Sequence, residues 1–479
     1  MVLPSCQVRP PVHVGRGPDT EETVDARRAV SNFPFGFNPG PGEGEDRPGG
    51  EPSPADPFAA MFGAGGGDIG AAFQNLGRLL SWQGGPVNWD LARDVARQVV
   101  AQAGDRSVTT ADREPVLDAV RLAELWLDSA TVFPSGSSGV VAWSRAEWVE
   151  ATIPAWQELV DPVAGRVVES MGTMLAGEGG PMSQLGLPPE QVQAMSAMTG
   201  PLQQMMKSVG GAMFGSQIGQ AIGGLAVEVV GSTDVGLPLA PAGRAALLPA
   251  NVAAFGEGLE VPADQVRLYL ALREMAHQRL FAHVPWLRGH LVEAVAAYAR
   301  GIHVDTARLE EALGSIDPTN PESLQQAMTG GMFEPEDTPE QTAALGRLET
   351  ALALVEGWVD EVVDAAAAPH LPSAAALRET VRRRRAGGGP AEQTFSSLVG
   401  LELRPRRLRE AAALWRAVLT ERGQAGREAV WAHPDLLPTG DDLDDPGAFA
   451  RGESAPLDLS GLDDTTAPPE PEPPSTPDA

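Results

Sequence analysis

From about residue 66 to about residue 450, apolar residues recur three and four positions apart. This spacing places the apolar side chains on one face of an α-helix, and no convincing alternation of apolar and polar residues interrupts it. Clear examples are 87–103, 110–130, 144–160 and 406–422. The sequence therefore predicts an all-α fold, a multi-helix bundle in one helical domain over residues 66–450.

The two ends of the chain differ in composition from this region. Residues 38–57 are rich in glycine, proline and acidic residues, and the chain after residue 450 is acidic and then proline-rich. Such segments cannot bury enough apolar surface to order. We predict disordered tails over 1–65 and 451–479. Residues 1–29 also lack any periodic pattern, and we interpret them as an over-extended gene start, with Val30 as the natural first residue.

Charge and composition limit the partners of the chain. The net charge of −29 argues against binding to nucleic acid and to anionic membrane surfaces. Residues 1–17 contain no apolar segment typical of a secretion signal, so a cytoplasmic location is expected. Cys6 is the only cysteine of the chain, which excludes an intrachain disulfide and a cysteine-built zinc site.

One uncharged stretch, 208–227, has the minimum length of a membrane span. Glycine recurs at every fourth position from Gly211 to Gly223, which leaves a smooth strip on one face of a helix. A neighbouring backbone can approach such a strip closely, in membranes and in soluble proteins alike. Because two glutamines also interrupt the stretch, we expect a buried helix packed against another helix, and membrane association is the weaker alternative.

The predicted helix 262–284 carries charged residues on its apolar face. Arg273 and His277 lie on the same stripe as Val266 and Leu270. The segment reads Arg-Glu-Met-Ala-His, which is the zinc-peptidase motif H-E-x-x-H with arginine in place of the first histidine. In the intact motif, two histidines one turn apart bind one metal ion, and the glutamate is the general base for the bound water.

A buried guanidinium needs carboxylate partners, because an isolated buried charge is very costly. For Arg273 the candidates are Glu274 and Glu356, the latter on a predicted helix that begins with a Thr338 cap and Pro339. Arginine can hydrogen-bond a carboxylate in bidentate fashion, so it can substitute for the positive charge of a metal ion. Surface placement of the motif is the alternative.

Five segments of the chain carry a resemblance, namely Leu248-Pro249-Ala250-Asn251-Val252, the motif with Gln278 and Phe281, Val284-Pro285-Trp286-Leu287-Arg288, Val355-Glu356-Gly357-Trp358 and Trp431 with Leu437-Pro438-Thr439. In this order they resemble the zincin-like hydrolases of actinobacteria. These are usually called zinc-dependent metalloproteases, and one branch is labelled as associated with biosynthesis of a deazaflavin cofactor. The resemblance spans about residues 68–450 and implies a helical zincin-like fold.

The resemblance also implies roles for single residues. Glu274 matches the general base, His277 matches the second metal histidine, and Glu356 matches a downstream carboxylate ligand. Arg273 and Trp358 stand where other members have histidine. Zinc is the cofactor that the resemblance implies, and with both imidazoles missing we predict that zinc is absent here.

Three functional hypotheses follow. The first is a zincin-like hydrolase homologue with lost or reduced peptidase activity and a binding or scaffolding role toward a protein or peptide. The second is an active metal-dependent hydrolase with Glu274 as base and His277 and Glu356 as ligands. The third is a structural or membrane-associated helical protein. For the second hypothesis, a third ligand would come from nearby histidines, namely His283, His290 or His303.

The run Arg382–Arg385 ends a further predicted helix, just before three glycines. Positive side chains in the last turn of a helix interact favourably with its dipole. We interpret the run as a helix end exposed to solvent, and binding of an anion is the alternative.

Overall fold

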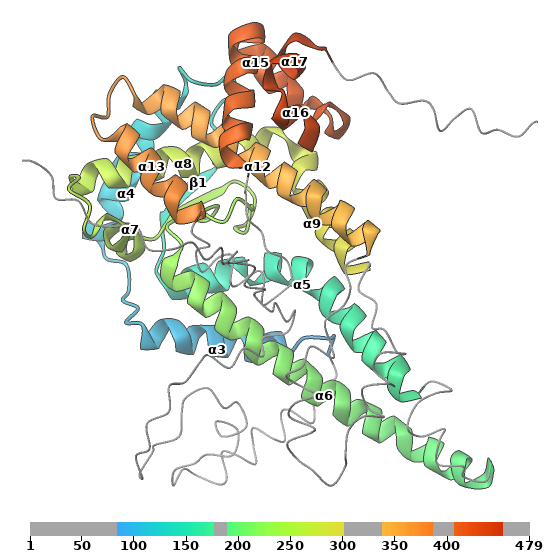
Figure 1. Ribbon diagram of the computed structural model, residues 1–479. Helices are drawn as coiled ribbons and strands as arrows, with labels where there is room; N and C mark the ends of the chain where they lie inside the picture. The colour runs from blue at the N-terminus through green and yellow to red at the C-terminus, as the bar shows by residue number, and fades with distance from the viewer. Residues whose placement is uncertain (1–83, 177–188, 301–337, 387–406, 454–479) are drawn as a thin grey trace, which may run out of the picture. The chain divides into compact units, whose positions relative to one another are not determined.

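The helices begin and end where the sequence supplies signals for them. Thr338 caps α12 (Pro339–Ala367) in a reciprocal capping box with Gln341, as predicted. Pro285 separates α8 (Ala263–His283) from α9 (Pro285–Arg300), since proline lacks the N–H that would continue the first helix. The structure, a computed structural model, describes residues 84–176, 189–300, 338–386 and 407–453 (Figure 1).

The described part of the chain is mainly α-helical, which confirms the predicted fold class. The predicted N-terminal tail and nearly all of the C-terminal tail lie outside the described residues, so the domain boundaries stay predictions. The other helices are α3 (Trp89–Gln102), α4 (Thr110–Leu127), α5 (Arg145–Ala176), α6 (Pro189–Glu228), α7 (Pro249–Gly256), α13 (Ala374–Ala386), α15 (Leu408–Ala429), α16 (Gly440–Asp444) and α17 (Pro446–Arg451), with 3-10 turns at Val430–Ala432 and Pro434–Leu436.

Two short strands were not predicted. β1 (Gly139–Ala142) and β2 (Arg244–Leu247) pair in parallel along their whole length. The segment that follows α6 runs along β2 as well, where Ser232 N–H donates to the Ala246 carbonyl at 3.0 Å. Strands of four residues are too short to show an alternating pattern in the sequence. They matter here because they hold the segment after α6 beside α8.

The helix α8 is the centre of the packing. It contacts α4, α7, α9, α12, α13 and β2, and every residue from Leu268 to Leu280 is buried. The sequence predicted one buried face, whereas neighbours enclose this helix on all sides. Surface placement of the motif is therefore wrong. Because buried polar groups must find partners inside the protein, the charged residues of α8 determine which side chains surround it.

The glycine strip is a packing surface between two helices. The predicted helix 208–227 is the second half of one continuous helix, α6. It lies beside α3 (Figure 1), and a Cβ at Gly219 would overlap the Ala92 carbonyl oxygen, so the predicted close approach of backbones is confirmed. Among the described residues, no helix combines the length and apolarity needed to cross a membrane.

This contact predicts opposite effects for two glycines of α6. We expect Gly219→Ala to lower the free energy of unfolding by about 1–3 kcal/mol, because the added methyl forces the two backbones apart. At Gly224 a Cβ meets no atom within 4 Å. Gly224→Ala should therefore be neutral or stabilise by up to about 1 kcal/mol, as alanine favours helix. Chemical denaturation measures both variants, and equal effects would contradict the packing.

Candidate functional site

Glu356 of α12 is surrounded by two guanidinium groups and one imidazole. Its Oε2 lies 2.6 Å from Nη2 of Arg273, and its Oε1 lies 3.0 Å from both Nε2 of His277 and Nη2 of Arg385. The Glu356 side chain is 1% exposed and the Arg273 side chain 6%. The structure thus brings together three residues that the sequence singled out, Arg273, His277 and Glu356, and adds Arg385 from α13.

The electrostatics of this cluster favour an ionised Glu356. Burial by itself would raise the pKa of Glu356, but the attraction of Arg385, His277 and Arg273 outweighs burial and holds the pKa well below its usual range. Burial also opposes the charge on Arg273, yet Glu356 raises the pKa of that guanidinium above its ordinary value. The pKa of Arg385 is lowered by burial, with repulsion from Arg273 contributing. Arginine nonetheless keeps its proton at neutral pH.

Both ring nitrogens of His277 lie within hydrogen-bonding distance of an oxygen. Nδ1 lies 2.9 Å from the backbone carbonyl of Arg273, which can only accept, so Nδ1 carries a proton. Nε2 lies 3.0 Å from Oε1 of Glu356. Nδ1 therefore has no lone pair for a metal ion, and Nε2 faces the carboxylate.

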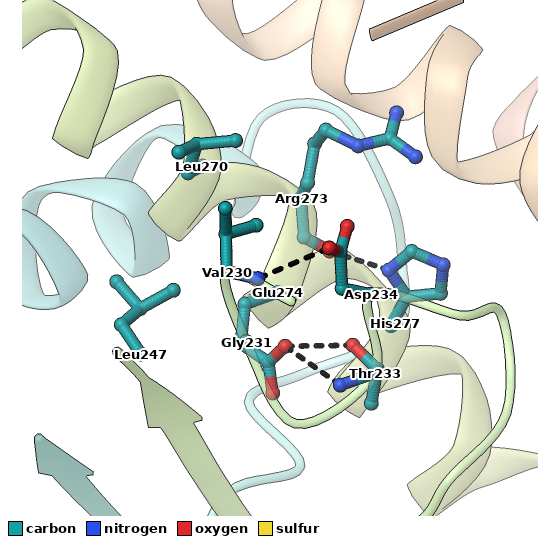
Figure 2. A pocket seen from close by; sticks show the side chains of 9 residues that line it. All are labelled: Val230, Gly231, Thr233, Asp234, Leu247, Leu270, Arg273, Glu274 and His277. Atoms are coloured by element: carbon teal, nitrogen blue, oxygen red, sulfur yellow. Dashed lines mark hydrogen bonds between the residues drawn. The ribbon is translucent and has the colours of Figure 1, made fainter. Parts of the chain in front are cut away.

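The Glu274 carboxylate turns away from Arg273 and toward the segment after α6 (Figure 2). Its Oε2 accepts from the Thr233 backbone at 3.1 Å and from the Thr233 hydroxyl at 2.7 Å. Its Oε1 accepts from the Ser232 hydroxyl and, at 3.1 Å, from Nε2 of Gln278. Of the two carboxylates predicted to partner Arg273, Glu356 takes that position and Glu274 anchors a loop. Both oxygens of Glu274 are occupied.

A glycine allows this loop to approach so closely. A Cβ at Gly231 would lie 2.5 Å from Oε2 of Glu274, so any other residue would displace the carboxylate. At the far end of the loop, Gly236 has a φ of +80°, a left-handed conformation that favours glycine. A Cβ there would lie 3.1 Å from Oε1 of Glu356. The loop 231–236 therefore covers both acids of the site.

The space left beside the motif is small. A cavity of about 10 Å³ lies between α8, β2 and the loop (Figure 2), which is room for about one water molecule. Pockets for organic ligands are on the order of 300–1,000 Å³. Among the described residues, this cavity is therefore too small to hold a peptide. The cavity is lined by Val230, Gly231, Thr233, Asp234, Leu247, Leu270, Arg273, Glu274 and His277.

An antiparallel ladder of ion pairs joins α12 to α13. Acidic residues one turn apart on α12 face arginines one turn apart on α13. The expected exposure of Arg382–Arg385 is therefore wrong for most of the run, and only Arg383 is exposed. The arginines turn inward because the acids of α12 are buried and need counter-charges. The pairs, in order along the interface, are Arg385–Glu356, Arg382–Asp360, Arg378–Asp360 and Arg378–Asp364.

The histidines considered as a third metal ligand do not reach the site within the described residues. Nδ1 of His283 lies 2.8 Å from the Arg279 carbonyl, and the His283 ring stacks on Phe133. The His290 ring lies edge-on to Trp286 on α9. His303 lies outside the described residues.

Trp358, where other family members were expected to have histidine, packs away from the cluster. Its ring contacts Phe133 and lies under the guanidinium of Arg427. Trp358 lies two positions after Glu356 on α12, which places their side chains on roughly opposite faces of the helix.

The donor set around Glu356 does not fit a zinc ion. A catalytic zinc takes three protein ligands and a water. Here Arg273 fills one of the two positions on α8, Nδ1 of His277 donates to a backbone carbonyl, and Glu356 already pairs with two guanidinium groups. Within the described ranges, no group of three or more His, Cys, Asp or Glu residues is arranged to hold a metal.

The motif helix indicates a zincin-like protein, and comparison of the chain with known protein families agrees. The chain belongs to the zincin-like metallopeptidase family, which matches residues 87–450. A crystal structure of a proposed hydrolase with a novel fold from Chloroflexus aurantiacus shares 22% identity, with a TM-score of 0.51. The similarity covers 77% of this chain and 98% of that one, and at this identity it establishes a shared fold. A search of curated proteins gives no match.

The ionised state of Glu356 predicts a loss of stability in acid. A carboxyl group with a lowered pKa in the folded protein stabilises the fold above its unfolded value of about 4.3, and the contribution is lost as the pH falls through the folded value. We expect the wild type to lose more free energy of unfolding than Glu356→Gln between about pH 7 and about pH 3. Chemical denaturation at both pH values measures this, and equal losses would show that Glu356 is not held ionised.

Sequence analysis missed Arg385, Ser232 and Thr233. For Arg385 a signal existed, because Arg378, Arg382 and Arg385 are spaced one helical turn apart, as are the acids of α12. For Ser232 and Thr233 no local pattern distinguishes them from other loop residues.

Proposed function

We propose that this protein is a zincin-like hydrolase homologue in which an arginine cluster has replaced the metal centre. On this proposal, Arg273-Glu274-x-x-His277 is the family motif H-E-x-x-H with its first histidine lost. The observation that carries it is the buried contact of 2.6 Å between Nη2 of Arg273 and Oε2 of Glu356. A guanidinium thereby occupies the side of the carboxylate that a metal ion would take.

The arrangement of Glu274 supports the same proposal. A general base must have an oxygen free to accept a proton from water. Both oxygens of Glu274 accept hydrogen bonds from Ser232, Thr233 and Gln278, so its charge is used to hold the loop 231–236. Metal-dependent peptidase activity is then lost or much reduced.

The remaining role is binding or scaffolding in the cytoplasm, with a protein or peptide as partner. The family membership and the likeness to a proposed hydrolase describe the ancestry of the fold. The enclosed motif, with room for about one water molecule, supports a role that does not use the motif as a catalytic centre.

Metal analysis of the purified protein tests this proposal. After dialysis against buffer with a trace of zinc, we expect much less than one equivalent of zinc per chain, and no peptidase activity that a chelator removes. Zinc at about one equivalent, together with chelator-sensitive hydrolysis of a casein substrate, would instead support an active enzyme with Glu274 as base and His277 and Glu356 as ligands.

A further inference from the structure

Two adjacent arginines at the end of α13 both approach the Asp234 carboxylate, Arg384 at 3.6 Å and Arg385 at 3.8 Å, but they differ in their other contacts. Arg385 reaches inward, where Nη2 lies 3.0 Å from Oε1 of Glu356 and 2.5 Å from the Asp234 carbonyl. Arg384 turns to the Glu228 carbonyl at 2.5 Å and lies over the ring of Phe255. Only Arg385 contacts Glu356, so Arg384 is a matched neighbour without that contact.

The two oxygens of Glu356 are held from different helices. Arg273 of α8 holds Oε2, while Arg385 of α13 shares Oε1 with His277. Removing the guanidinium of Arg273 would therefore free only one oxygen. A permanent positive charge would still lie within hydrogen-bonding distance of the carboxylate, because arginine does not give up its proton in proteins.

We propose that Arg385 is a positioning residue that keeps Glu356 unavailable to any metal ion, even when position 273 carries a histidine. The inference rests on the proposed function, in which Arg273 replaces the metal. It adds that two substitutions, and not one, separate this site from a zinc site. Histidines at 273 and 277 with a free Glu356 would be a donor set of two imidazoles and one carboxylate, which zinc uses in catalytic sites.

The charge of Arg385 is the reason that one substitution does not suffice. A zinc ion bound to Glu356 would lie a few ångströms from this guanidinium, where like charges repel strongly in a buried site. Arginine has no unprotonated form in proteins that could relieve this repulsion. Arg385 also donates to the Asp234 carbonyl and so connects the loop 231–236 to α13.

Zinc titration of matched variants tests the inference. The proteins are the wild type, Arg273→His, Arg273→His/Arg385→Met and the control Arg273→His/Arg384→Met. We expect Arg273→His/Arg385→Met to bind one zinc at least about 100-fold more tightly than Arg273→His and than the control. Cobalt(II) in place of zinc should give intense visible absorption, typical of four-coordinate sites, with that variant alone. Circular dichroism confirms the fold of each protein.

Three other results would contradict either the role of Arg385 or the proposed function. Equal zinc affinity of Arg273→His and Arg273→His/Arg385→Met would overturn the role of Arg385 and leave the proposed function intact. A folded Arg273→His/Arg385→Met that binds no zinc would overturn it too. Stoichiometric zinc in the wild type would overturn the proposed function itself. If the methionine variant does not fold, Arg273→His/Arg385→Gln makes the same test, because glutamine keeps a donor for the Asp234 carbonyl.

Discussion

Glu356→Gln should lower the free energy of unfolding by about 3–5 kcal/mol, the usual cost of removing one partner from a buried ion pair. The reason is that Arg273 and Arg385 would stay buried without their shared negative charge. The amide of glutamine would also direct N–H groups at cations that need acceptors. Urea denaturation of the wild type and the variant at neutral pH measures the difference.

A surface glutamate provides the control for this experiment. Glu293 pairs with Arg300 at 2.7 Å, with both side chains more than half exposed. Because exposed ion pairs contribute little, Glu293→Gln should change stability by less than about 1 kcal/mol. If Glu356→Gln costs no more than Glu293→Gln, the cluster around α8 does not hold the helices together as the structure indicates.

Glu274→Gln should lower the free energy of unfolding by about 2–4 kcal/mol, because hydrogen bonds to a buried charged group are strong and their loss leaves donors unpaired. Those donors are the Ser232 hydroxyl and the backbone and hydroxyl of Thr233. A catalytic base usually behaves differently, since residues selected for activity are often replaced without loss of stability. The stability of this variant therefore separates an anchor from a base.

A double variant tests whether Glu274 stabilises the protein through its hydrogen bonds to the loop 231–236. Thr233→Val removes one hydroxyl donor of Glu274 and keeps the shape of the side chain. Combined with Glu274→Gln, its effect on stability should be smaller than the sum of the two single effects, because both remove the same interaction. Strictly additive effects, measured by urea denaturation, would mean that Glu274 does not hold the loop.

Much of the fold was predictable because its signals are local. The caps of α12, the break at Pro285 and the glycine strip of α6 each depend on residues within a few positions of one another. The two strands were not predictable, since four residues carry no period and their pairing joins residues about 100 positions apart.

In the candidate site, too, local features were predictable from the sequence and contacts between distant residues were not. The stripe on α8 predicted that Arg273 and His277 are buried on one face, and Glu356 was one of two possible partners. The position of α12 decides which carboxylate pairs with Arg273. Glu356, which does so, lies 83 residues further along the chain. Arg385 was interpreted as solvent-exposed, because a helix end looks the same in sequence whether or not an acidic helix covers it.

The amino-acid sequence by itself determined the helical class, several helix boundaries and the presence of a charged pair inside the central helix, because periodicity and capping act between near neighbours in the chain. Only the tertiary structure decided that Glu356 contacts Arg273, His277 and a second arginine, and that Glu274 anchors a loop. The physical reason is that a buried charge must be compensated by whatever group packing brings within a few ångströms, and packing joins residues that are far apart in the chain.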